Sequence, residues 1–221
     1  GFTELGSGFK IAMRDLSIRG AGNILGASQS GFIDSVGFEM YSQLLEEAIN
    51  KRQGKTQVRR KGNAEFNLQI DAYLPSDYIS DERQKIEIYK RIREIENQKD
   101  YQYLQDELID RFGEYPDQVA YLIEIGLVRA YLDAAFAELV ERKNDTIIVR
   151  FEKVSLKFFL TQDYFEAISK TNLKARISDN QGKVEIIFDV RNKKDYEILE
   201  ELKIFGQTFM EIKKRKEKKE T

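Results

Sequence analysis

The sequence predicts an α+β fold, in which an N-terminal helical hairpin and loop precede a compact domain of about five helices packed on a small antiparallel sheet. Apolar residues recur at helical spacing through most of residues 38–136, and short β-rich segments separated by turn signals follow from residue 137. Hydrophobic residues make up 41% of the 221 residues and charged residues 33%, which is typical of a globular chain with a buried core.

Residues 1–50 are expected to form the helical hairpin. Its clearest helix is FEMYSQLLEEAINK, whose apolar side chains at i, i+3 and i+4 give one buried face. Residues 51–64 are polar, basic and interrupted by Gly54 and Gly62, and therefore predict a linker between the hairpin and a C-terminal domain of residues 65–221. The sequence starts in mid-pattern without Met, so we expect a piece of a longer chain.

The first half of the C-terminal domain predicts one strand and three helices. EFNLQIDAYLP alternates apolar and polar side chains and is expected to form a strand that Pro75 ends. Asp81 is placed to cap the next helix, with Gln84 as its capping-box partner. DYQYLQDELIDRFG predicts a second helix that Gly113 stops. Pro116 then opens DQVAYLIEIGLVRAYLDAAF, whose apolar residues on nearly every side predict the central, buried helix.

The second half of this domain mixes strands with helices. AELVE and TIIVRFE predict a hairpin about residues 143–145, and LKARISD and KVEIIFDV predict another about residues 180–182. Between the hairpins, SLKFFLTQDYFEAISK predicts a helix that begins near Ser155. KKDYEILEELKIFGQTFMEIKKRKEKK predicts a long closing helix with a frayed basic end.

The composition excludes several classes of enzyme. Without His or Cys the chain cannot build a Ser-His-Asp or Cys-His nucleophile, nor a zinc site of the usual ligands. No GxxxxGK[ST] loop occurs, and no apolar run reaches the roughly 20 residues of a membrane helix. We therefore expect no catalysis, cofactor or metal in this chain, no membrane partner and a cytoplasmic location. A carboxylate magnesium enzyme is the alternative, because 38 acidic residues make chance clusters common.

Three glycines, Gly20, Gly22 and Gly26, fall within seven positions of the stretch RDLSIRGAGNILGASQSGF at residues 14–32. A dinucleotide site requires GxGxxG directly after a buried strand, so that backbone N–H groups meet a pyrophosphate. Here the spacing is GxGxxxG, and a charged segment precedes it. The pattern disfavours a nucleotide cradle, and a glycine-rich connection between two helices is the plain alternative.

The same stretch resembles a motif that follows the second motor domain in RecG translocases and in transcription-repair coupling factors (Mfd). The pattern RDLxIRGxGxxLGxxQxG is long and specific, and its continuation GFxxYxQLLEEAI is similar to the coupling-factor branch. Further along, AYLPSDYISDERQKIEIYKRI and ELIDRFGEYPDQV resemble the C-terminal domain of coupling factors. The resemblance covers residues 1–142 in recognisable motifs.

The resemblance implies the C-terminal part of an ATP-driven translocase on double-stranded DNA, which removes stalled RNA polymerase and recruits UvrA. ATP and magnesium would act in the parent protein, and RNA polymerase and UvrA would bind its other parts. In the family the motif couples nucleotide state to the grip on DNA. The positions implied for this coupling are Arg14, Arg19, Gly20, Gly22, Gly26 and Gln29. From the residues alone, a surface salt bridge between Arg19 and Asp15 is the simpler interpretation.

An acidic segment occupies the middle of the chain. The resemblance implies that the C-terminal domain packs against an N-terminal UvrB-like module of the same protein and masks its UvrA-binding site. Glu107 and Asp110 match the family's contact residues, and a spacing of three places them on one side of a helix. From the residues alone, this is a solvated acidic face with Asp110 paired to Arg111 or Lys99.

Basic residues gather in the linker and in the tail from residue 213. The linker candidates for contacts with DNA phosphates are Lys51, Arg52, Arg59 and Arg60. No aromatic residues are interleaved with them, so base stacking is not indicated. A solvated tether is the alternative for the linker, and disorder is the alternative for the tail. The competing function is therefore a non-enzymatic nucleic-acid-binding module acting through these segments.

Overall fold

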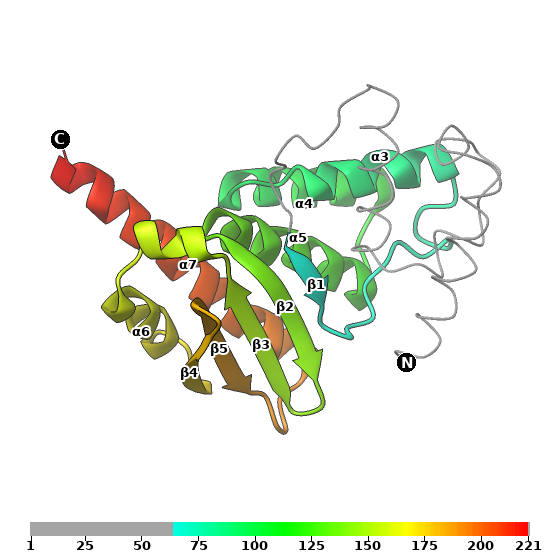
Figure 1. Cartoon of the computed structure of the whole chain (residues 1–221). Helices are drawn as coiled ribbons and strands as arrows, with labels where there is room; N and C mark the ends of the chain where they lie inside the picture. Colours follow the sequence, from blue (N-terminus) through cyan, green and yellow to red (C-terminus); the bar gives the residue numbers. More distant parts are fainter. Residues whose placement is uncertain (1–63, 221) are drawn as a thin grey trace, which may run out of the picture. The chain divides into compact units, whose positions relative to one another are not determined.

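The computed structural model describes residues 64–220, so the hairpin and linker expected before residue 64 lie outside this part. The described residues form two compact units, one of residues 69–126 and the other of residues 64–68 and 127–220. They contain five α-helices and a five-stranded sheet, which confirms the predicted α+β class (Figure 1).

The first unit contains α3 (Glu82–Arg93), α4 (Gln98–Phe112) and the first half of α5 (Asp117–Ala134). Asp81 caps α3 as predicted, because its carboxylate accepts a hydrogen bond from the Gln84 N–H at 3.0 Å. Gly113 ends α4 with φ of 84°, a conformation that glycine adopts without strain. Helix α5 starts directly after Pro116, also as predicted. Local end signals therefore set the limits of these helices.

Helix α5 buries apolar side chains on several sides, as its composition predicts. The residues with no exposed surface are Val119, Leu122, Ile123, Leu127, Val128 and Leu132. A Cβ atom at Gly126 would lie 2.8 Å from Ile92 Cγ2, so glycine at this position lets α5 approach α3 closely.

The strand predicted over residues 65–75 is wrong in length. Strand β1 (Glu65–Asn67) is short, and residues 68–75 belong to no strand. Burial still alternates along this segment, but Gln69 has φ of 56°, which interrupts the extended backbone. The Leu74 N–H donates instead to the Tyr89 hydroxyl of α3 at 2.9 Å. The Tyr89 hydroxyl thus accepts the hydrogen bond that a neighbouring strand would accept in a sheet.

The second unit is built on a sheet with the strand order β1-β2-β3-β5-β4. Its remaining strands are β2 (Ala137–Lys143), β3 (Thr146–Phe151), β4 (Lys174–Asn180) and β5 (Lys183–Asp189). All neighbours pair antiparallel except β1, which runs parallel to β2. The sheet is therefore mixed, whereas the sequence predicted an antiparallel one, because β1 arrives from a distant part of the chain and not through a hairpin turn.

Both predicted hairpins are confirmed. Asn144 and Asp145 connect β2 to β3, and Asn144 has φ of 54°. Gln181 and Gly182 connect β4 to β5 with φ of 54° and 86°. In the β4–β5 turn, positive φ at both central residues is the geometry of a type I′ turn, which matches the twist of the flanking strands.

The helix predicted from Ser155 is wrong in extent. The segment forms a short 3-10 helix, η3 (Lys153–Lys157), and then α6 (Thr161–Ser169). The buried Ser155 hydroxyl lies 2.7 Å from the Tyr164 hydroxyl, and the Asp163 carboxylate accepts from the Leu160 N–H at 2.8 Å, where α6 begins. These contacts fold the segment back on itself at Phe158–Leu160 instead of letting one helix continue.

Helix α7 (Asp195–Glu220) runs to the end of the described chain, so the prediction of a frayed basic end is wrong. Ion pairs hold this end to α6: Arg215 pairs with Glu166 at 2.8 Å and Lys216 pairs with Asp163 at 2.5 Å. These contacts stabilise the last turns, which lack apolar residues of their own.

The core of the second unit lies between one face of the sheet and α7 (Figure 1). An aromatic cluster fills it, made of Phe151, Phe159, Tyr164, Phe188, Phe205 and Phe209. Phe209 lies 5.0 Å from the ring centres of both Phe159 and Phe205, in edge-to-face geometry. Burial of these side chains stabilises the unit.

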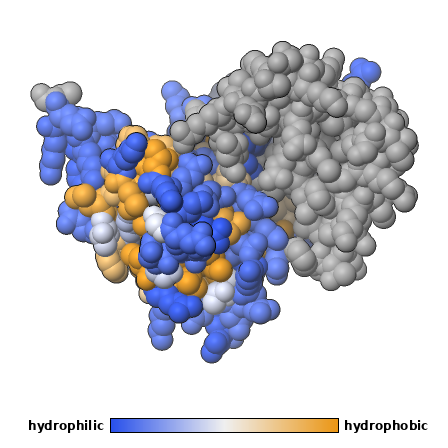
Figure 2. Space-filling view, viewed as in Figure 1, coloured by the Kyte–Doolittle hydropathy of each residue, from blue (hydrophilic) through white to orange (hydrophobic). Residues whose placement is uncertain are grey.

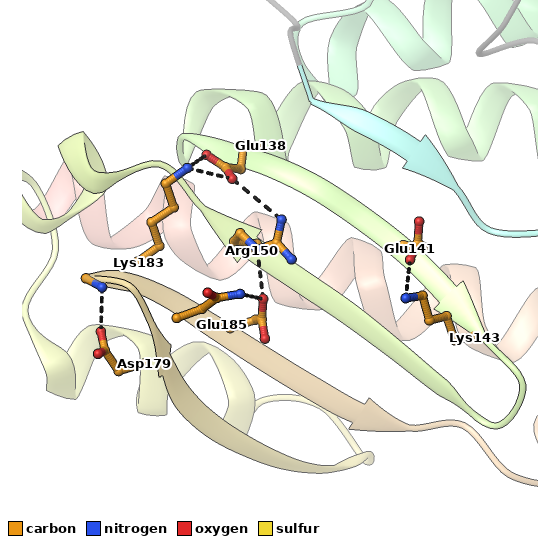
Figure 3. A network of polar contacts seen from close by, with 9 residues as sticks. Glu138, Glu141, Lys143, Arg150, Asp179, Lys183 and Glu185 are labelled. Carbon is orange, nitrogen blue, oxygen red and sulfur yellow. Dashed lines mark hydrogen bonds and ion pairs between the residues drawn. The ribbon is translucent and has the colours of Figure 1, made fainter.

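The opposite face of the sheet carries a network of ion pairs (Figure 3). The Lys183 ammonium donates to Glu138 at 2.8 Å, and Arg150 lies between Glu138 and Glu185. Burial alone would raise the pKa of Glu185, but hydrogen bonds from Asn180 and Arg150 lower it overall. The cross-strand pairs link β2, β3 and β5 on a half-exposed face.

Apolar side chains also reach the surface of this unit (Figure 2). Four large ones from η3, α6 and the residues that connect them are exposed: Leu156, Phe158, Leu160 and Phe165. None of the helices between residues 64 and 220 is long and apolar enough to cross a membrane.

Candidate contact surface on helix α4

Helix α4 is held by its inward face, and this fixes which residues point outward. Tyr101, Leu104 and Leu108 are buried at i, i+3 and i+7. The Tyr101 hydroxyl donates to Glu124 of α5 at 3.0 Å, and the Asn97 side chain caps the helix by accepting from the Asp100 N–H at 2.9 Å. The residues on the opposite side of α4 therefore face away from the unit.

Tyr78 secures the C-terminal end of α4. Its hydroxyl lies 2.7 Å from the Gly113 carbonyl oxygen and 3.2 Å from that of Leu108, and can donate to either acceptor. Burial, together with the nearby Tyr115 and Glu114, raises the pKa of Tyr78 to about 12. The phenol therefore stays protonated and able to donate throughout the neutral range.

Replacing Tyr78 with Phe is expected to lower the free energy of unfolding by about 1 kcal/mol, because the two carbonyl groups lose their donor. The pKa of Tyr78 is higher in the folded chain, about 12, than the value of 10.0 for an unperturbed tyrosine. The stabilisation is therefore complete below pH 10.0 and is lost as the pH rises through about 12. Urea unfolding at neutral pH measures the loss, and a difference titration of tyrosinate absorbance between the two proteins measures the pKa. A Tyr78 that ionises at pH 10.0 would contradict the assignment.

Glu107 belongs to an ion-pair network between α3 and α4. Its carboxylate pairs with Arg91 of α3, and it accepts a second hydrogen bond from Arg111 at 3.1 Å. Arg111 also pairs with Glu87 of α3 at 3.2 Å, and its hydrogen bond with Glu107 raises the pKa of the guanidinium. The network contains two positive and two negative side chains, so it carries no net charge.

Asp110 differs from Glu107, because its side chain is exposed and forms no ion pair with any residue in the described part of the chain. The alternative pairing of Asp110 with Arg111 or Lys99 is therefore wrong here: Arg111 bonds to Glu87 and Glu107. Asp106, one turn earlier, is also exposed and accepts only the neutral Gln102 amide at 3.1 Å. Two uncompensated carboxylates thus face outward on α4.

An exposed aromatic residue, which the sequence interpretation missed, shares this side of the helix. Tyr103 lies four residues before Glu107 and seven before Asp110, and 68% of its surface is exposed. The Arg91 guanidinium lies over its ring, 5.9 Å from the centre. The signal available in the sequence was a tyrosine at helical spacing from the two acids.

The other predicted site residues lie outside the described part of the chain. These are the coupling positions Arg14, Arg19, Gly20, Gly22, Gly26 and Gln29 and the linker positions Lys51, Arg52, Arg59 and Arg60. Within residues 64–220, no group of three or more acidic side chains has the geometry to hold a metal ion.

Comparison with known proteins places this surface in a defined domain. A family model described as the TRCF domain matches residues 68–162. The transcription-repair-coupling factor of Bacillus subtilis is 52% identical over 146 residues, which is 66% of this chain and 12% of that protein. The protein of the same name from Staphylococcus haemolyticus is 52% identical over 149 residues, or 67% of this chain and 13% of the relative.

A solved structure decides the assignment. The crystal structure of the C-terminal domain of transcription-repair coupling factor is 64% identical, with a TM-score of 0.69, and the match covers 72% of this chain and 99% of that one. The chain belongs to the transcription-repair-coupling factor family. It spans only 12–13% of the length of the curated relatives. The resemblance inferred from the sequence motifs is confirmed, and helix α4 is part of the TRCF domain.

Proposed function

We propose that this chain is the regulatory C-terminal part of an ATP-dependent translocase on double-stranded DNA. The parent protein removes stalled RNA polymerase and recruits the UvrA/UvrB excision machinery, and ATP and magnesium act in its motor domains, not in this chain. Family membership and the long motif RDLSIRGAGNILGASQSGF support this proposal. The role of the chain itself is to couple and regulate, without catalysis.

The N-terminal motif supplies the coupling between ATP state and DNA movement in this proposal. Arg19 offers a planar guanidinium that suits a phosphate or carboxylate, and Gln29 adds a neutral donor and acceptor. Arg14 and the three glycines, Gly20, Gly22 and Gly26, complete the segment.

Replacing Arg19 with Ala in the full-length parent is expected to abolish translocation, because the grip on DNA no longer follows the nucleotide state. ATP hydrolysis is expected to continue, because the ATP site lies elsewhere. Displacement of a DNA triplex strand measures movement, and phosphate release measures hydrolysis. Normal displacement by the variant would reject the coupling role.

In this proposal the C-terminal domain regulates the recruitment of UvrA by masking the surface that binds it. Helix α4 contacts the N-terminal UvrB-like module of the same protein and covers its UvrA-binding surface until the parent engages DNA. The observation that carries this role is the pair of exposed, uncompensated carboxylates on α4, Asp106 and Asp110. A contact based on a few exposed charges is modest in strength and sensitive to salt, so engagement elsewhere in the parent can release it.

The affinity of this chain for the isolated UvrB-like module, compared with its affinity for duplex DNA, tests the masking role. We expect binding to the module at low salt, weakened as salt is raised, and weaker binding to the DNA. Preferential binding to DNA would favour the competing function, a nucleic-acid-binding module acting through the basic linker and the basic end of α7.

A further inference from the structure

Tyr103 is the most exposed of the large hydrophobic side chains in the described part of the chain, at 68%. It lies in the middle of α4, not in a loop, so its backbone is fixed by the buried residues of the same helix. The Arg91 guanidinium, 5.9 Å from the ring centre, also limits the orientations of the side chain. An aromatic side chain that is exposed and already ordered loses little conformational freedom on binding.

The charges around Tyr103 indicate the kind of surface that it meets. Asp106 and Asp110 follow it at i+3 and i+7 and are exposed, while Glu107 is neutralised by Arg91 and Arg111. A partner with arginine or lysine side chains next to a small apolar recess is complementary to this arrangement. Tyrosine and arginine are frequent among the residues that contribute most to binding at protein–protein interfaces.

We propose that Tyr103 is the anchor of the contact between α4 and the UvrB-like module, and that Asp106 and Asp110 supply its charge pairs. Glu107 acts instead inside the domain, where it holds Arg91 beneath the tyrosine ring. The inference rests on the proposed function, and it moves the centre of the contact from the Glu107–Asp110 pair to Tyr103. The tyrosine ring fills the recess, and partner cations reach the two carboxylates that follow it along the helix.

Binding of variants of the whole chain to the UvrB-like module of the parent tests this assignment by titration calorimetry at low salt. Tyr103→Ala is expected to weaken binding about 30-fold, the loss typical of an interface anchor. Tyr103→Phe is expected to retain most of the affinity, because the ring is kept. Asp110→Asn is expected to weaken binding several-fold at low salt and to have little effect at high salt.

Ile109→Ala is the matched control, because Ile109 is also exposed on α4 but lies about 120° around the helix axis from Tyr103. Its affinity should equal that of the unmodified chain. Glu107→Gln should lower the urea midpoint of the chain, because it breaks the ion pairs between α3 and α4. Its affinity for the module should change less than that of Tyr103→Ala.

The outcomes separate the two levels of the proposal. If the unmodified chain binds and Tyr103→Ala binds equally well, the anchor assignment is overturned while the masking role stands. If the unmodified chain does not bind the module at all, the masking role fails and the anchor fails with it. Circular dichroism of Tyr103→Ala should match the unmodified chain, because removing so exposed a ring leaves the core intact.

Discussion

Replacement of Phe209 with Ala is expected to lower the free energy of unfolding of the second unit by about 3–5 kcal/mol. Phe209 has no exposed surface, and its ring lies 5.0 Å from those of Phe159 and Phe205 and 5.4 Å from that of Phe151. Truncation removes the buried ring and leaves a cavity whose walls belong to α7 and the sheet, which cannot easily close in. The edge-to-face contacts are lost as well.

Urea unfolding followed by far-ultraviolet circular dichroism measures this loss. Phe165→Ala is the matched control: it removes the same atoms from a side chain that is 55% exposed, and should change the stability by no more than about 0.5 kcal/mol. Phe209→Leu should fall between the two. Equal stabilities for Phe209→Ala and Phe165→Ala would show that the cluster is not the core of this unit.

Reversing both Glu107 and Asp110 to Lys in the full-length parent is expected to expose the UvrA-binding surface, so that UvrA is captured without DNA. The change replaces two negative charges with two positive ones on a face proposed to meet a cationic partner, so attraction becomes repulsion. Capture of purified UvrA on the immobilised protein at low salt measures the effect.

Glu211→Lys with Glu217→Lys is the matched control, because it makes the same change of charge at exposed positions on α7. Asp110→Lys alone is also informative, since Asp110 takes no part in the network with Arg91 and Arg111. Unchanged UvrA capture by the double variant, with the protein still folded, would argue against masking by α4.

Features set by neighbouring residues could be predicted from the sequence. The cap at Asp81, the stop at Gly113 and both hairpin turns depend on side chains or φ angles within a few positions. The prediction failed where a distant partner decides the local structure. The segment after Asn67 leaves the sheet, and Leu74 finds its hydrogen-bond acceptor on Tyr89, 15 residues away. The break between η3 and α6 likewise depends on a contact between Ser155 and Tyr164.

On the contact surface, too, features set by nearby residues could be predicted and features set by distant residues could not. Helical spacing places Glu107 and Asp110 on one side of α4, but it cannot tell which of them is already paired. That depends on Arg91, which lies 16 residues earlier and comes close only when α3 packs against α4. The exposure of Tyr103, in contrast, follows from helical spacing, because residues 101 and 103 lie about 200° apart around the helix axis and Tyr101 is buried.

The two ion pairs between α6 and the end of α7 bear on how this chain can be shortened. Helix α6 has nine residues, fewer than an isolated helix needs to persist in water. Arg215 and Lys216, in the last turns of α7, form ion pairs with α6. The composition of these turns, which is almost entirely charged, gives no sign of this contact. A truncated form for crystallisation or binding studies should therefore end after Lys216. A chain that ends at Ile212, the last apolar core residue, would lose both ion pairs, and α6 would be less stably packed on the second unit.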